Sequence, residues 1–189
     1  VNMSKVLKEC ADRGINLLRI PVSTQILLEW KNGEAKTPDT PVDADGFNKE
    51  LVHADGTPYN NLEIFNALIS MCKENGIKIM VDVHSAEANN AGHNYPLWYN
   101  TGAGITTEDW IEGWEWLVER YKNDDTLIAC DLKNEPHGKV DEGDFAKWDG
   151  SEDINNWRYA AIQCAEAILK INPNLLIMVE GVEMNPKEG

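Results

Sequence analysis

The stretch 126–138, TLIACDLKNEPHG, decides the fold class that we predict for this chain. Its first part, 126–133, is largely apolar, as expected of a strand that is covered on both faces of a parallel sheet. Asn134 and Glu135 follow directly, and Pro136 ends the element. A short buried strand with polar residues at its C-terminal end is typical of α/β proteins.

Four times along the chain, a strand of this kind follows a helix-like segment. Apolar residues recur at helical spacing from Ser4, from Asn60 or Asn61, from Thr106 or Thr107, and from Trp157. Gly14 and Gly76 suit the ends of the first two helices, and Pro173 prevents continuation of the last. The strands are expected at 15–22, 77–84, 126–133 and 175–181. Four α-then-β units in sequence predict a parallel sheet.

Polar residues gather at the C-terminal ends of these strands: Arg19, Asp82, His84, Asn134, Glu135 and Glu180. Such ends converge on one face of a barrel, where its active site lies, and a complete barrel takes about 250 residues. We therefore predict an α/β fold in which residues 1–189 form part of a (β/α)8 TIM barrel, roughly its first half to two thirds, without the C-terminal strands. A flavodoxin-like or Rossmann nucleotide binder would need a glycine-rich phosphate loop after the first strand, and the sequence has none.

Charge and composition disfavour several classes of partner. The net charge of −15 would repel nucleic acids and anionic membrane surfaces. No apolar run approaches the roughly 18 residues of a transmembrane helix.

The sequence contains no convincing metal-binding pattern. The residues Cys10, Cys72, Cys130 and Cys164 are predicted to be buried small hydrophobes, because their wide spacing fits no zinc motif. The sequence DADG at 43–46 fails the calcium-loop pattern, since the first and last ligand positions would be Pro41 and Val52. We predict no metal and no cofactor.

Asn134-Glu135-Pro136 carries the strongest chemical signal. Cleavage of a glycosidic bond with retention needs one carboxyl group to protonate the leaving oxygen and a second, about 5 Å away, to attack the anomeric carbon. Glu135 at a strand end suits the first role, and the Asn134 amide can bind the sugar 2-hydroxyl. Three common residues also fit a solvated turn that proline ends. Their position in a series of βα units favours the catalytic interpretation.

Five stretches resemble glycoside hydrolase family 5, in particular its bacterial endoglucanases, in order and spacing: LLRIPVS (17–23), IMVDVHS (79–85), LWYN (97–100), ERYKNDDTLIACDLKNEPHG (119–138) and NNWRYAAIQCAEAILKINPNLLIMVEGVE (155–183). The resemblance implies a secreted or cell-surface retaining cellulase that cleaves β-1,4-glucan by double displacement. It implies that Glu135 is the general acid/base and that Arg19, His84 and Asn134 belong to the active site. It places the nucleophilic Glu two strands beyond 175–181, outside this chain, and makes Glu180 non-catalytic. The expected partners are the polysaccharide and the remaining C-terminal part of the barrel.

Each of these residues also has a plainer interpretation. Arg19 could keep the nucleophile ionised or form a structural ion pair, and His84 could orient the nucleophile or be a satisfied core histidine. His93 could bind a glucosyl unit, and Trp98 and Trp148 could stack on one, although ordinary loop packing explains them nearly as well.

Three other tryptophans, Trp110, Trp114 and Trp157, recur at core spacing and are predicted to be structural. Alternative functions are a mannanase or xyloglucanase, or a catalytically silent split half or carbohydrate-binding fragment.

Overall fold

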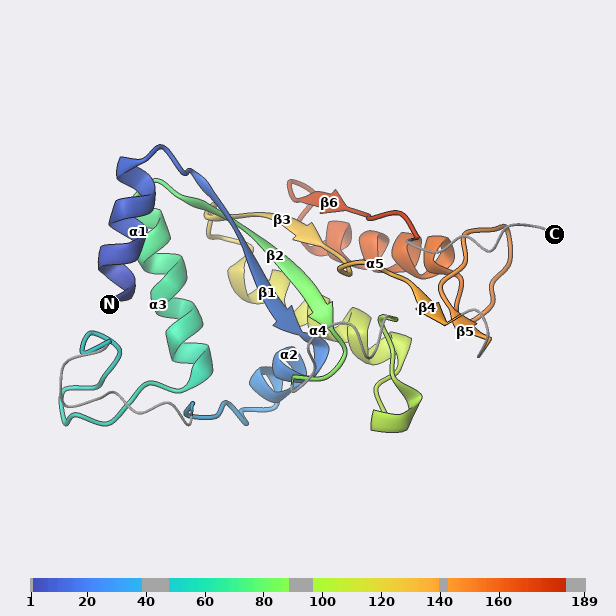
Figure 1. Cartoon of the computed structure of the whole chain (residues 1–189), viewed down its shortest axis with the longest axis horizontal. Coiled ribbons are helices and arrows are strands. Elements are labelled where there is room, and N and C mark those ends of the chain that lie inside the picture. The colour runs from blue at the N-terminus through green and yellow to red at the C-terminus, as the bar shows by residue number, and fades with distance from the viewer. Residues whose placement is uncertain (1, 39–47, 89–96, 140–142, 183–189) are drawn as a thin grey trace.

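The computed structural model describes residues 2–38, 48–88, 97–139 and 143–182. Figure 1 shows its elements in chain order: α1 (Met3–Asp12), β1 (Leu17–Ser23), α2 (Thr24–Lys31), α3 (Asn61–Glu74), β2 (Lys78–Ser85), η1 (Thr101–Ala103), α4 (Thr107–Tyr121), β3 (Leu127–Asp131), β4 (Gly138–Lys139), β5 (Asp144–Phe145), α5 (Trp157–Ile171) and β6 (Leu176–Met178).

The main sheet has four parallel strands in the order β1-β2-β3-β6. Each of these strands follows a helix, so the four predicted α-then-β units are confirmed. The register places Pro21 beside Asp82, Asp82 beside Asp131, and Asp131 beside Met178. Polar groups near the ends of all four strands are thereby brought to one end of the sheet.

Two helices begin at capping boxes that the sequence signals. The Asn60 side chain accepts the backbone N–H of Glu63, and the Glu63 carboxylate accepts the backbone N–H of Asn60. Thr106 and Asp109 make the same reciprocal pair at the start of α4. Each pair satisfies two backbone donors that a helix terminus leaves free, which fixes the first turn.

The core lies between the sheet and its helices. Leu27, Val81, Val83, Leu117 and Ile168 are among its buried members. Trp110, Trp114 and Trp157 are also fully buried, as predicted. Three cysteines, Cys72, Cys130 and Cys164, are buried with free thiols, whereas Cys10 is only half-buried. Figure 1 shows α4 and α5 on the same side of the sheet.

The other face of the sheet differs from our expectation that both faces of every strand are covered. Alternate residues of the two edge strands point away from the helices: Leu17 is 44% exposed, Leu176 61% and Met178 47%. Side chains alternate across a strand, so these residues share one face, and within the described part of the chain no element covers them. This is the face that would line the interior of a closed barrel.

The segment that follows β1 begins with a helix, α2, that we did not predict. Ser23 caps it by accepting the backbone N–H of Ile26 at 3.1 Å, and Leu27 and Trp30 bury its apolar face. The helix packs closely on α4 at Gly113. A Cβ added to this glycine would lie only 3.2 Å from the Cβ of Leu27. The short pair β4 and β5 was not predicted either.

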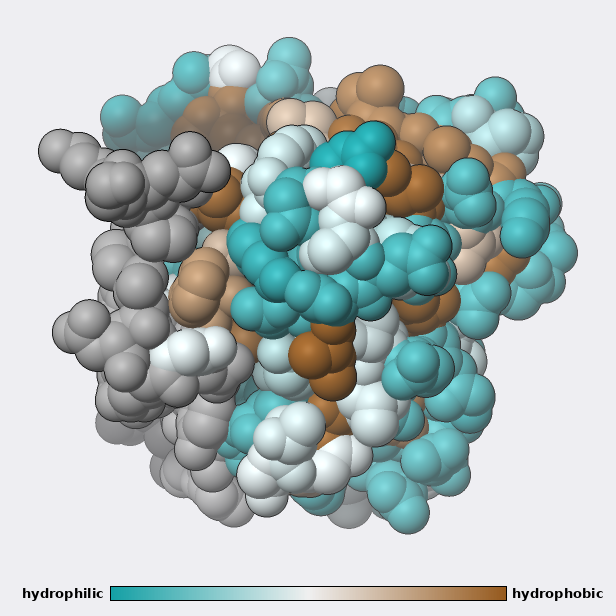
Figure 2. Space-filling view, turned by 90° about the vertical axis from the view of Figure 1, so that its right-hand side faces the viewer, coloured by the Kyte–Doolittle hydropathy of each residue, from teal (hydrophilic) through white to brown (hydrophobic). Residues whose placement is uncertain are grey.

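The end of the molecule that carries β4, β5 and the start of α5 is covered mainly by hydrophilic side chains, with small apolar patches between them (Figure 2). Two exposed apolar residues, Trp148 and Ile154, belong to the segment between β5 and α5. None of the helices in the described ranges is long and apolar enough to cross a membrane.

Candidate active site

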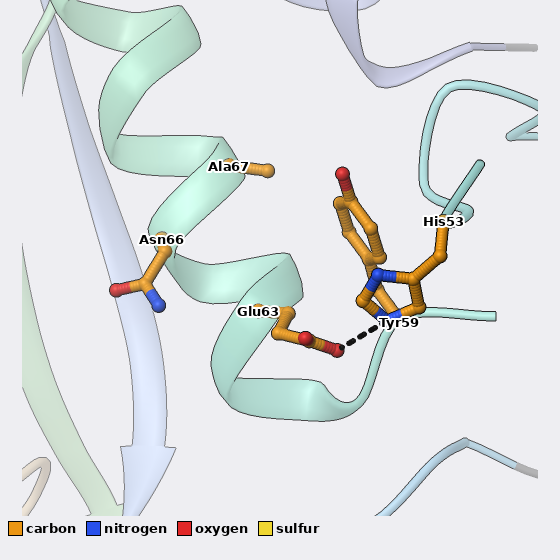
Figure 3. A pocket seen from close by; sticks show the side chains of 5 residues that line it. All are labelled: His53, Tyr59, Glu63, Asn66 and Ala67. Carbon is orange, nitrogen blue, oxygen red and sulfur yellow. Dashed lines mark ion pairs between the residues drawn. The ribbon is translucent and has the colours of Figure 1, made fainter. Parts of the chain in front are cut away.

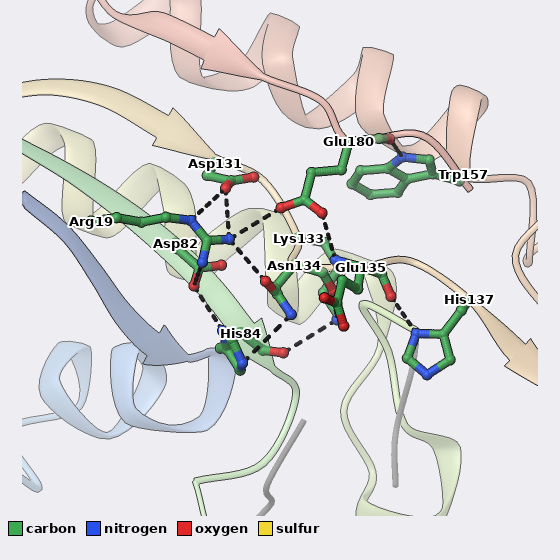
Figure 4. A network of polar contacts seen from close by, with 10 residues as sticks. All are labelled: Arg19, Asp82, His84, Asp131, Lys133, Asn134, Glu135, His137, Trp157 and Glu180. Atoms are coloured by element: carbon green, nitrogen blue, oxygen red, sulfur yellow. Dashed lines mark hydrogen bonds and ion pairs between the residues drawn. The ribbon is translucent and has the colours of Figure 1, made fainter. Parts of the chain in front are cut away.

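The C-terminal end of the sheet brings a polar cluster together around Arg19 (Figure 4). Its side chains come from β1, β2, β3 and the segments that follow β3 and β6: Arg19, Asp82, His84, Asp131, Lys133, Asn134, Glu135 and Glu180. The structure thus places four of the predicted active-site residues, Arg19, His84, Asn134 and Glu135, in one cluster. Their catalytic roles stay predictions.

Arg19 is the centre of this cluster. Its Nη1 lies 3.0 Å from Asp82 Oδ2, and its Nη2 lies 2.8 Å from Asp131 Oδ2 and 3.1 Å from Glu180 Oε1. Nη2 also donates to Asn134 Oδ1 at 3.0 Å. Burial opposes the charged form of Arg19, but hydrogen bonding to Asp131 and the charges of the three carboxylates raise its pKa. The guanidinium therefore stays cationic and joins all four strand ends.

His84 is held between Asp82 and Asn134. Its Nδ1 lies 2.8 Å from Asp82 Oδ2, so the N–H at that position is donated to the carboxylate. Its Nε2 then faces the Asn134 amide nitrogen, Nδ2, at 3.5 Å. Because Arg19 takes the oxygen of the same amide, the Asn134 side chain is fixed with its NH2 group toward His84.

Glu135 has an unusual backbone and an exposed side chain. Its φ angle is 43°, in the left-handed region that residues other than glycine rarely adopt. Its backbone N–H donates to Glu180 Oε2 at 2.9 Å, and its carbonyl oxygen is hydrogen-bonded to His137 Nδ1. The residue is exposed at the end of the sheet, where a substrate could reach its carboxyl group.

Two tryptophans of α4 and one of α5 hold the strand ends in place. The indole N–H groups of Trp110 and Trp114 donate to the carbonyl oxygen of Leu132, at 3.1 and 3.3 Å. The indole of Trp157 donates to the carbonyl oxygen of Glu180 at 2.7 Å. The buried aromatic residues of the helices thus fix the segments that carry Asn134, Glu135 and Glu180.

Asp82 and Asp131 are buried carboxyl groups at the base of the cluster. Burial raises the pKa of both, to about 6 for Asp131, although contacts with Arg19 oppose the shift. The Oδ1 atom of each is buried without a hydrogen-bond partner in the described structure. Removing the charge of Arg19 would therefore leave two poorly solvated carboxyl groups side by side.

Sequence reasoning missed the roles of three members of the cluster. Asp131 and Lys133 were treated as parts of a strand, and Glu180 was placed among the polar strand ends but given no role beyond being non-catalytic. Strand periodicity gives a usable signal for the first two. Asp131, Lys133 and Glu135 occupy every second position, and every second side chain of a strand points to the same face. The contact of Glu180 with Arg19 joins residues that are 161 positions apart, and no local pattern signals it.

Trp98 corrects one of our predictions. We predicted that it could stack on a glucosyl unit, with ordinary packing as the alternative, but its ring is fully buried and packs against Trp157 and Trp110, with centroids 5.1 and 6.2 Å away. Its indole N–H donates to Thr107 Oγ1 at 3.0 Å. A ring with no exposed face cannot bind a sugar, so Trp98 is a core residue.

For His93 and Trp148, the other two predicted sugar-binding residues, sugar binding stays a prediction. Trp148 is 51% exposed, so it is not a core residue. His93 and the DADG sequence lie outside the described residues. Within the described ranges, no three His, Cys, Asp or Glu side chains are grouped so that they could hold a metal ion.

A separate hollow of about 340 Å³ lies beside α3 (Figure 3). His53, Tyr59, Glu63, Asn66 and Ala67 line it. Glu63, His53 and Asn66 already have partners: Glu63 accepts from the Asn60 backbone and pairs with His53 at 3.3 Å, and Asn66 accepts the Tyr121 hydroxyl at 2.6 Å. These contacts give the residues a structural role without a ligand. The polar cluster around Arg19 therefore remains the candidate active site.

Comparison with known proteins matches residues 1–188 to the family described as cellulase (glycosyl hydrolase family 5). Endoglucanase G of Acetivibrio thermocellus is 47% identical over 98% of this chain, and an endoglucanase of Paenibacillus polymyxa is 34% identical over 97%. The chain spans 36% and 41% of the lengths of these two relatives.

Solved structures of endoglucanases share the fold. A cellotetraose complex of an endocellulase from Pyrococcus horikoshii superposes with a TM-score of 0.79 at 30% identity, covering 98% of this chain and 47% of that one. The catalytic domain of the major endoglucanase of Xanthomonas campestris gives a TM-score of 0.75 at 26% identity, with the same coverage. The four α-then-β units are therefore part of a (β/α)8 barrel, and the chain belongs to the cellulase family, glycosyl hydrolase family 5.

Proposed function

We propose that this chain supplies the N-terminal part of a retaining endo-β-1,4-glucanase and that Glu135 is its general acid/base. The observation that carries the proposal is the exposed Glu135 at the end of the sheet, next to an Asn134 amide that Arg19 and His84 orient. The endoglucanase relatives and the cellotetraose complex of a structural neighbour support a β-1,4-glucan as the substrate.

The proposed reaction divides its two carboxyl groups between this chain and the remaining strands of the barrel. Glu135 protonates the glycosidic oxygen while a carboxylate from those strands attacks the anomeric carbon. Water then hydrolyses the glycosyl-enzyme, with Glu135 acting as the base. In this mechanism the Asn134 NH2 group donates to the sugar 2-hydroxyl. Arg19, whose guanidinium already contacts three carboxyl groups of this chain, would help to keep the nucleophile ionised.

The test uses a completed enzyme, which we define as this chain joined at its C-terminal end to the C-terminal barrel strands of endoglucanase G. We expect it to release reducing ends from carboxymethylcellulose faster than from mannan or xyloglucan. NMR should show the β-anomer as the first product. Preferred hydrolysis of mannan or xyloglucan would contradict the substrate, and the α-anomer as first product would contradict retention.

Asp131→Asn should reduce the pH dependence of the stability of this enzyme. The pKa of Asp131 is raised to about 6, so between about pH 4 and 6 the folded state keeps a proton that the unfolded chain releases. The free energy of unfolding should therefore fall as pH rises through this range, by at most about 3 kcal/mol from this group. Urea unfolding at pH 4 and pH 7 measures the fall, which should be smaller in the variant. An equal fall in both proteins would contradict the assignment.

A further inference from the structure

Lys133 is a fully buried cation two residues before the candidate acid/base, Glu135. It is 0% exposed and is one of the largest fully buried side chains of the described structure. Burying an ammonium group costs several kcal/mol unless nearby groups compensate for the lost water. An apolar residue would fill the same space without this cost, so the charge at this position calls for an explanation.

The hydrogen bonds of Lys133 go to the backbone at the ends of two strands. Its Nζ donates to the carbonyl oxygen of His84, at 3.2 Å, and to that of Asn134 (Figure 4). The first bond ties the segment after β3 to the end of β2. The second holds the peptide group that joins Asn134 to Glu135.

That peptide group is held from both sides. Lys133 binds its carbonyl oxygen, and Glu180 Oε2 accepts its N–H at 2.9 Å. A peptide group is planar, so fixing its oxygen and its hydrogen fixes the direction from which the chain enters Glu135. The orientation of the Glu135 side chain depends on this direction.

The backbone of Glu135 needs such support. A φ of 43° in a residue other than glycine costs roughly 1–2 kcal/mol and persists only where the surrounding contacts impose it. Lys133 and Glu180 supply two of these contacts, and they belong to different strand ends. The strained backbone is therefore fixed by the assembled sheet.

The charge of Lys133 is maintained at neutral pH. Burial lowers its pKa to about 8, while the nearby carboxylates of Asp82, Glu180, Glu135 and Asp131 oppose the shift. An ammonium group donates to two carbonyl oxygens, which no apolar residue of similar length can do.

We propose that Lys133 is a positioning residue that holds the Asn134–Glu135 peptide, and with it the left-handed backbone of Glu135, in the geometry that proton donation to the glycosidic oxygen requires. The inference rests on the proposed function, because it gives Lys133 a role only if Glu135 is the acid. Lys133 itself does not touch the substrate in this account.

The test is Lys133→Met in the completed enzyme, because Met has a similar length and no donor. We expect kcat/KM for a cellobioside with a poor leaving group, such as phenol, to fall about 10- to 100-fold, as misplacement of a catalytic group by about 1 Å can cost. For a 2,4-dinitrophenyl cellobioside, whose leaving group needs no proton, it should change less than threefold. Since kcat/KM reports the steps up to formation of the glycosyl-enzyme, the later role of Glu135 as a base does not enter the comparison.

The ratio of the two kcat/KM values distinguishes positioning from general damage. Partial unfolding lowers both values equally and leaves their ratio unchanged, whereas a misplaced acid changes the ratio. If Lys133→Met gives no soluble enzyme, Lys133→Gln, whose amide can donate to one of the two carbonyls, is measured in the same way. Lys122→Met, at an exposed lysine at the end of α4, serves as the matched control and should leave the ratio as it is.

The parent enzyme and Glu135→Gln separate this inference from the proposed function. If the parent does not hydrolyse glucan, or if Glu135→Gln keeps its activity, the proposed function fails and the role of Lys133 fails with it. If the parent is active and Glu135→Gln is not, an unchanged ratio in the Lys133 variants overturns the positioning role alone.

Discussion

Glu135→Gln in the completed enzyme should lower kcat/KM on carboxymethylcellulose about 1,000-fold, within the range of 10²–10⁴ that general acid catalysis contributes. The departing sugar alkoxide is a poor leaving group without a proton, and glutamine cannot supply one at neutral pH. The backbone contacts of residue 135 with Glu180 and His137 do not involve the side chain, so the substitution should leave the local fold intact.

The leaving group shows whether the loss comes from missing acid catalysis. With a 2,4-dinitrophenyl cellobioside, formation of the glycosyl-enzyme should be much less affected, and azide should restore turnover by attacking the intermediate without a base. Glu119→Gln, at an exposed position of α4, is the matched control and should retain full activity. Near-normal activity of Glu135→Gln on carboxymethylcellulose would show that the acid/base is another residue.

This chain by itself should show no glucanase turnover, and mixing or co-expressing it with the remaining barrel strands should restore activity. Double displacement needs two carboxyl groups about 5 Å apart, and we assign only the acid/base to this chain. The purified chain, verified by mass, is assayed on carboxymethylcellulose and on aryl cellobiosides. Turnover at ordinary enzymatic rates would force Glu180 or another carboxylate of this chain into the role of the nucleophile.

The uncovered face of the sheet gives the same experiment a second readout. Leu17, Leu176 and Met178 are exposed on that face, and β1 and β6 are edge strands of the sheet. The isolated chain should therefore bind a hydrophobic dye or aggregate, and the added strands should suppress both. A chain that stays monomeric without binding the dye would show that this face needs no complement.

The sequence predicted the α-then-β repeat because each unit is encoded locally. Helical spacing, capping residues such as Asn60 and Thr106, and apolar strand segments all lie within short windows. The position of Asn134 and Glu135 at a strand end could be predicted for the same reason. The helix α2 also carries local signals, the Ser23 cap and the pair Leu27 and Trp30, which our sequence analysis overlooked.

Contacts between distant segments could not be predicted in this way. Trp98 lies in a loop, and nothing near it in the sequence shows that Trp157 and Trp110 enclose its ring. The same holds for Lys133 and Glu180, which hold one peptide group from different strand ends. Local patterns predict the elements, whereas burial and pairing depend on how the sheet assembles.

The central claim is that this chain supplies the acid/base and that the nucleophile lies outside it. A 2-deoxy-2-fluoro-cellobioside with a dinitrophenyl leaving group traps the glycosyl-enzyme, because the fluorine slows its hydrolysis. After the completed enzyme has been labelled and digested, mass spectrometry should locate the fluorocellobiosyl group on a glutamate of the added C-terminal strands, with every peptide of residues 1–189 unlabelled. A label on Glu180, or on any other carboxylate of this chain, would contradict the account.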